Sequence, residues 1–102
     1  VKVAQDFRFA PGVYHRVRMQ VRLNEPPSVA NGFVHVSVDG RELIRHEGIR
    51  FRSVEGSESL IQTVLFSTFH GGSSPDWAPR TADGAYKVDC AYFDDFGVEA
   101  LQ

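Results

Sequence analysis

Cysteine and net charge are what this sequence most clearly lacks. Its single cysteine, Cys90, cannot form an internal disulfide and has no second cysteine with which to hold a metal ion or run a redox cycle. The chain has 11 lysine and arginine residues against 13 aspartate and glutamate residues, a formal net charge of -2. It is therefore not a globally basic protein, and any attraction for polyanions must come from charges that cluster locally.

Long apolar segments are missing as well. The chain starts at Val1, with neither a charged leader before an apolar stretch nor a run of 18 apolar residues, which predicts no signal peptide, no membrane span and no membrane partner. No helical apolar period of useful length occurs. With 102 residues the chain has room for one core, so we expect a single β-domain over residues 1–102.

What the sequence does contain is alternation with period two. Residues 13–24 place mainly apolar side chains on one face, which predicts a half-buried strand. Its other face carries Tyr14, Arg16, Arg18, Gln20, Arg22 and Asn24. Residues 33–38 alternate in the same way, with valines on one face and Phe33, His35 and Ser37 on the other.

The rest of the chain also favours strands. Asp39 and Gly40 both tolerate positive φ, so they predict a type I′ hairpin whose second strand runs to Arg45. Further strands are expected at residues 49–52, 60–69 and 87–98, with an irregular loop through residues 71–84. This spacing predicts an all-β fold, an antiparallel β-sandwich of jelly-roll type that is incomplete in this chain.

Three arginines alternate on the polar face of the strand at residues 13–24. Neighbouring like charges repel, so Arg16, Arg18 and Arg22 gain most when an anion lies across them. The planar guanidinium also suits a carboxylate, which it binds through two hydrogen bonds. The alternative is that these arginines pair with acidic side chains of the adjacent strand.

Histidines and aromatic residues offer further candidates. His35 would lie beside arginine and glutamine if its strand pairs with residues 13–24, and could then act as an acid or base, or be merely hydrogen-bonded. The four histidines lack the spacing of a zinc site, so we expect no metal. Trp77 could stack on a sugar ring, whereas basic and aromatic residues do not interleave on one strand, which disfavours nucleic acid.

Several segments together resemble one family, polysaccharide lyase family 14, which contains the alginate and polyuronate lyases and is related to the glucuronan lyases. The similar segments are residues 9–15, 20–24, 36–40, 66–73, 77–79 and 92–96. The most specific is Phe-His-Gly-Gly-Ser at residues 69–73, followed by Trp-Ala-Pro at residues 77–79. The likeness extends along almost the whole chain.

This resemblance implies a jelly roll that binds an acidic polysaccharide in a concave sheet, with no cofactor and a secreted or extracellular location. It also implies that the chain is the C-terminal half of a catalytic domain. Gln20 and Arg22 match a family pair that binds the uronate carboxylate, whereas a family pair of tyrosines matches His35 and Ser37. With both tyrosines absent, either His35 replaces their acid/base function, Tyr14 supplies it, or the chain is not catalytic.

Three functions therefore follow from the sequence. The first is a lyase that cleaves alginate, glucuronan or a similar polyuronate by β-elimination, with Gln20, Arg22 and His35 as catalytic residues. Its substrate-binding residues would be Tyr14, Arg16, Arg18, Ser37 and Trp77. The alternatives are a non-catalytic carbohydrate-binding module for acidic glycans and a structural or interaction domain. Open strand edges would in each case allow self-association.

Overall fold

A computed structural model describes residues 1–69 and 71–100 of the chain. These form two compact units, Val1–Val64 and Leu65–Gln102. His70, which belongs to the most specific segment of the family resemblance, lies outside the described residues. The single domain expected over residues 1–102 stays a prediction.

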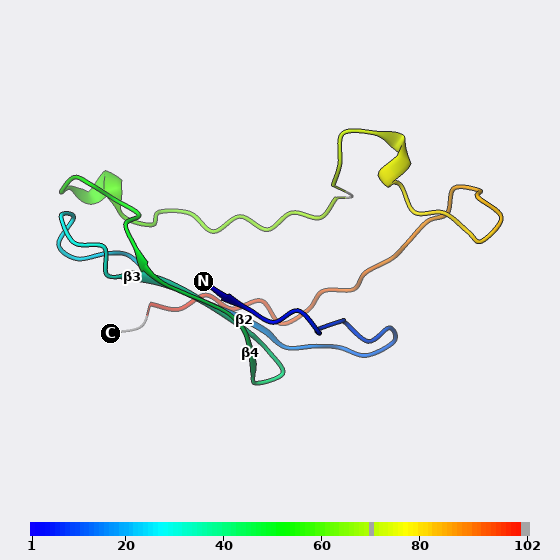
Figure 1. Cartoon of the computed structure of the whole chain (residues 1–102), viewed down its shortest axis with the longest axis horizontal. Coiled ribbons are helices and arrows are strands. Elements are labelled where there is room, and N and C mark those ends of the chain that lie inside the picture. The colour runs from blue at the N-terminus through cyan, green and yellow to red at the C-terminus, as the bar shows by residue number, and fades with distance from the viewer. Residues whose placement is uncertain (70, 101–102) are drawn as a thin grey trace. The chain divides into compact units, whose positions relative to one another are not determined.

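The first unit contains one antiparallel sheet (Figure 1). Its strands are β1 (Lys2–Val3), β2 (Val17–Arg22), β3 (Gly32–Val38) and β4 (Arg41–Ile49), in the order β1-β4-β3-β2. Helical structure in the described residues is limited to the short 3₁₀ turns η1 (Ser57–Ser59) and η2 (Pro75–Trp77). The all-β prediction is confirmed, and the single sheet is consistent with an incomplete β-sandwich.

The hairpin between β3 and β4 forms at the predicted turn. Asp39 has φ 50° and Gly40 has φ 81°, as a type I′ turn requires, and Val38 pairs with Arg41 on either side of it. The returning strand extends past the predicted end at Arg45 to Ile49. The separate strand expected at residues 49–52 is wrong, because only Ile49 is in a strand and it belongs to β4.

Two irregularities interrupt the pairing of β3 with β4. Ser37 pairs with Glu42 but Val36 pairs with Ile44, so Leu43 is an extra residue in β4. A second extra residue lies near Gly48, whose φ of 67° suits glycine. Each extra residue changes which side chains of β4 share a face with those of β3.

One face of the sheet is apolar and exposed. Val17, Met19 and Val21 of β2 are 56%, 67% and 37% exposed, so the prediction of a half-buried strand over residues 13–24 is wrong in burial as well as in length. The reason is that the unit Val1–Val64 contains a single sheet, and no second layer within it covers this face. Val38 is the one buried hydrophobic side chain among the described residues.

Glycine is required where β3 starts beside the end of β2. A Cβ on Gly32 would lie 2.8 Å from the carbonyl oxygen of Arg22 and 2.9 Å from that of Ile49. These distances are shorter than van der Waals contact, so a larger residue would push the neighbouring strands away. Gly32 therefore allows the ends of β2 and β4 to approach the start of β3 closely.

Asn24 holds the turn that follows β2 against the segment after β4. Its side chain is fully buried; Nδ2 donates to the carbonyl oxygens of Pro27 (3.2 Å) and Arg52 (3.0 Å), and Oδ1 accepts from the amides of Phe51 (2.8 Å) and Arg52 (3.0 Å). Arg52 is also buried; its Nε donates to the Asn24 carbonyl oxygen, and its guanidinium forms an ion pair with Glu25. A polar side chain thus replaces hydrophobic packing at this position.

We expect Asn24→Ala to lower the free energy of unfolding by roughly 2–3 kcal/mol, because buried amides and carbonyls lose their partners. Urea unfolding of the whole chain measures this change. Asn31→Ala is the matched control: Asn31 exchanges two hydrogen bonds with the Glu25 backbone but is exposed, so water can replace them. Equal losses in the two variants would contradict the special role of Asn24.

The strands expected at residues 60–69 and 87–98 are not present in the described residues. No neighbouring strand forms backbone hydrogen bonds with either segment there, and a strand exists only through such pairing. Their aromatic side chains do meet within the second unit, where the Phe66 ring lies 4.8 Å from the rings of Phe93 and Phe96. The irregular loop predicted for residues 71–84 is confirmed, apart from the short turn η2.

The described residues include no helix of the length and apolarity that crossing a membrane requires.

Candidate functional site

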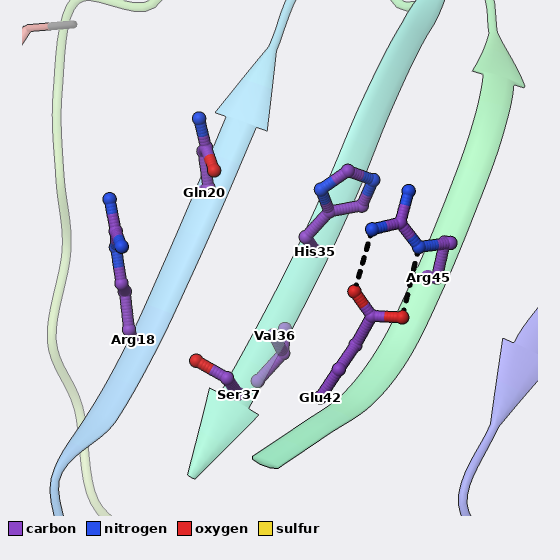
Figure 2. A pocket seen from close by; sticks show the side chains of 7 residues that line it. All are labelled: Arg18, Gln20, His35, Val36, Ser37, Glu42 and Arg45. Carbon is purple, nitrogen blue, oxygen red and sulfur yellow. Dashed lines mark hydrogen bonds and ion pairs between the residues drawn. The ribbon is translucent and has the colours of Figure 1, made fainter. Parts of the chain in front are cut away.

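The polar face of the sheet brings several predicted site residues together (Figure 2). Gln20 of β2 pairs with His35 of β3, Arg18 pairs with Ser37, and Arg22 pairs with Phe33. The expectation that His35 lies beside glutamine and arginine is therefore confirmed. This arrangement follows from period-two alternation in both strands, since antiparallel pairing in this register puts both polar faces on the same side.

A shallow depression of about 220 Å³ lies on this face. Its lining residues are Arg18, Gln20, His35, Val36, Ser37, Glu42 and Arg45. It contains four of the predicted site residues, whereas Arg22 lies on the same face but outside the lining. On a strand, Gln20 is about 6.5–7 Å from each of its neighbours Arg18 and Arg22, so the three side chains form a row.

The arginines of β2 are not neutralised by the adjacent strand. Among the described residues, neither Arg18 nor Arg22 forms an ion pair, which disagrees with the alternative that acidic neighbours balance them. The carboxylates on this face lie on β4, beyond β3, and bind Arg45 instead. The β2 side of the face is therefore cationic and available to an anion.

His35 is held on two sides. Its ring stacks on Phe33 with centroids 4.2 Å apart and an angle of 12° between the planes, and its Nε2 lies 3.1 Å from Oε1 of Glu47. The side chain is 20% exposed, so the ring is fixed but can still be reached. This histidine is hydrogen-bonded, as one interpretation of the sequence expects, and it also faces the depression.

Sequence reasoning missed the charged residues of β4. Nε and Nη2 of Arg45 donate to the two carboxylate oxygens of Glu42 at 2.9 and 2.8 Å (Figure 2), and its Nη1 donates to Oε1 of Glu47 at 2.6 Å. The hydrogen bonds from Arg45 lower the pKa of Glu42, and Glu42 in turn raises the pKa of Arg45. Both groups therefore stay charged, and Arg45 is not free to bind a ligand.

The remaining predicted site residues lie outside the depression. Arg16 precedes β2, and its backbone amide donates to Oδ1 of Asp39 at 2.9 Å. Tyr14 is 69% exposed and belongs to no strand. Trp77 lies in η2 of the second unit and is 67% exposed; a Cβ on Gly72 would be 2.4 Å from its ring, so Trp77 covers that glycine.

His15 has a structural role at the tip of the hairpin. Its Nδ1 lies 2.6 Å from Oδ2 of Asp39, and its Nε2 accepts from the Ala10 amide at 3.0 Å. The hydrogen bond to Asp39 raises the pKa of His15, while the Arg16 amide, followed by His15, lowers the pKa of Asp39. His15 is thus held by hydrogen bonds on both ring nitrogens, and its ring lies 5.3 Å from that of Phe9.

The described residues include no cluster of three or more histidine, cysteine, aspartate or glutamate side chains that could hold a metal ion.

Fold and site together define an all-β domain with a cationic, hydrogen-bonding sheet face beside a fixed histidine. Among known proteins, the family model for polysaccharide lyase 14 matches residues 2–95. The chain belongs to polysaccharide lyase family 14. No curated protein and no solved structure matches it significantly.

Proposed function

We propose that this chain takes part in cleaving an acidic polysaccharide, a polyuronate such as alginate or glucuronan, by β-elimination. The observation that carries the proposal is the pairing of Gln20 with His35 on a face where Arg18 and Arg22 form no ion pair with described residues. Neighbouring side chains can thus bind a substrate carboxylate and accept a proton. Family membership supports polysaccharide cleavage as the reaction class.

The reaction needs three things from the protein. Arg22 and Gln20 bind the carboxylate at C6 and stabilise the negative charge that develops there when the C5 proton leaves. His35 takes that proton, the electron pair forms the C4–C5 double bond, and the C4–O bond to the leaving sugar breaks. The leaving oxygen then takes up a proton, for which protonated His35 is the nearest donor in this arrangement.

The other predicted residues would bind the polymer on either side of the reacting sugar. Arg18 and Ser37 lie next along β2 and β3 and would meet a neighbouring uronate. Arg16, Tyr14 and Trp77 are exposed and remain proposed contacts. A secreted or extracellular location belongs to the same proposal, because a large polyanion does not cross a membrane unaided.

Self-association is a further part of the proposal. β2 is an edge strand of the described sheet, and such edges invite pairing with another chain. Antiparallel pairing of two copies about Gln20 would, however, put Arg18 of one copy opposite Arg22 of the other, and like charges in that position destabilise a sheet. A polyanion bound across both copies would relieve this repulsion.

The test is incubation of the protein with a panel of polyuronates while the absorbance of unsaturated sugar ends is followed. A rise with one polymer supports the lyase and names its substrate. Binding to a polyuronate without any rise would make the chain a carbohydrate-binding module. If the protein neither binds a polyuronate nor raises the absorbance, the result contradicts both the lyase and the carbohydrate-binding module. The structural or interaction domain would then be the remaining function.

A further inference from the structure

The geometry around His35 points to a specific role for Glu47 and Arg45. We propose that they hold the proton of neutral His35 on Nε2 and so make Nδ1 the nitrogen that accepts the substrate proton. The inference rests on the proposed β-elimination and deepens it by naming the positioning residues of its base. Neither residue was a candidate from the sequence.

One carboxylate oxygen of Glu47 contacts both Arg45 and His35. Oε1 of Glu47 lies 2.6 Å from Nη1 of Arg45 and 3.1 Å from Nε2 of His35. A guanidinium can only donate hydrogen bonds, and an ionised carboxylate can only accept them. Because Oε1 has to act as an acceptor, Nε2 must carry the hydrogen, which leaves the lone pair of neutral His35 on Nδ1.

The position of Arg45 is itself fixed. Glu42 binds it through two parallel hydrogen bonds, at 2.9 and 2.8 Å, the geometry in which guanidinium and carboxylate interact most strongly. The chain of contacts therefore runs from Glu42 through Arg45 and Glu47 to Nε2 of His35. It comes from a single strand, β4, so the residues that orient the base are held by one element.

The ring plane is set independently. Phe33 stacks on the imidazole at 12°, so the ring cannot turn about its long axis without losing this contact. Among the described residues, no side chain or backbone group forms a hydrogen bond with Nδ1. The ring is thus fixed by Phe33, its hydrogen by Glu47, and its basic nitrogen is left for a ligand. A carboxylate orients a catalytic histidine in the same way in the serine protease triad, where the two ring nitrogens have the opposite roles.

The experiment measures the histidine directly and does not depend on activity. Nitrogen-15 chemical shifts of the side chain in the whole chain report which ring nitrogen of neutral His35 carries the hydrogen. We expect Nε2 in the unaltered protein and a mixture of both forms in Glu47→Ala. Glu47→Gln should keep the hydrogen on Nε2, because Arg45 holds the amide oxygen in the acceptor position.

Kinetics on the cleaved polymer give the second measurement. In Glu47→Ala we expect kcat to fall by about a hundredfold, the cost of a misplaced catalytic group, with little change in KM. Glu47→Gln should retain most of the activity. Asp6→Asn is the control, because it removes the exposed ion pair of Arg41, which lies at the hairpin end of β4 opposite Val38 and does not contact His35 or Glu47; its activity should be unchanged.

The outcomes separate this inference from the proposed function. A hydrogen on Nδ1 in the unaltered protein overturns the inference whether or not the polymer is cleaved, and this holds even if Glu47→Ala fails to fold. An active protein whose kcat is unchanged in Glu47→Ala also overturns it. A protein that cleaves no polyuronate but keeps the hydrogen on Nε2 refutes the lyase and leaves the orientation of His35 established.

Discussion

Replacing His35 by glutamine is expected to slow polymer cleavage by about two to four orders of magnitude, the usual contribution of a general acid or base. Glutamine retains a polar side chain of similar reach but cannot take a proton from carbon. Binding of the polymer should persist, because the arginines of β2 are untouched. Initial rates of absorbance increase, measured on the same polymer as the unaltered protein, give the comparison.

The pH dependence strengthens this test. A histidine base works only when neutral, so the rate of the unaltered protein should fall toward acid pH, and this fall should disappear from the residual activity of His35→Gln. His46→Gln is the control: His46 pairs with Val34 and thus belongs to the opposite face of the sheet. An identical pH profile in His35→Gln would show that His35 is not the acid or base, and would favour Tyr14 for that function.

Replacing Arg22 by alanine should lower kcat/KM by about two to three orders of magnitude, or roughly 3–4 kcal/mol of transition-state stabilisation. The C5 proton is only weakly acidic, so the reaction depends on donors that stabilise the charge moving onto the carboxylate. Arg22→Lys should recover part of the loss, because lysine keeps the charge but cannot form two parallel hydrogen bonds. The same absorbance assay measures all three proteins.

Two further arginine variants test whether the loss of activity is specific to Arg22. Arg18→Ala should mainly raise KM, because Arg18 would contact a neighbouring uronate and not the reacting one. Arg41→Ala removes a cation that is already paired with Asp6 at 2.6 Å, and it should have little effect, as exposed ion pairs contribute little. If kcat fell further in Arg18→Ala than in Arg22→Ala, the side chains that bind the C6 carboxylate would be Arg18 and Gln20, the pair that lines the depression.

The β2–β3–β4 meander and half of the candidate site could be predicted from the sequence because both depend on local rules. Alternation places Arg18, Gln20 and Arg22 on one face, and Asp39-Gly40 requires a tight hairpin. Alternation also puts His35 on the same face as Gln20 if the two strands pair, and the structure supplies the register in which they are opposite each other. Where a strand and its turn are both specified, the side chains that face each other are specified too.

The charged residues of β4 could not be predicted because they depend on an irregularity. Regular pairing from the hairpin would place Ile44 opposite His35 and Arg45 opposite Val34, on the apolar face. The extra residue at Leu43 moves Arg45 opposite His35 instead. The local pattern of Glu42 to Arg45 does not predict this shift, because the shift results from how the whole strand fits its neighbour.

The predicted strands at residues 60–69 and 87–98 failed for a different reason. Their β-branched and aromatic residues favour strands, but that preference expresses packing against neighbours more than an intrinsic backbone tendency. The described residues give these segments no paired strand, and their apolar side chains are mostly exposed, Leu65 by 86% and Val88 by 88%. A propensity without a partner does not form a sheet.

The extra residue at Leu43 also bears on how such a surface can evolve. In most proteins a catalytic group is gained or lost by exchanging one side chain for another. Here, regular pairing of the same residues from the hairpin would turn Arg45 and Glu47 to the apolar side and bring Ile44 and His46 in their place beside the depression. Deletion of Leu43 itself would leave Ile44 opposite Val36 and Arg45 opposite His35. A change in strand register, with no side chain exchanged, would therefore present different chemistry to the polymer.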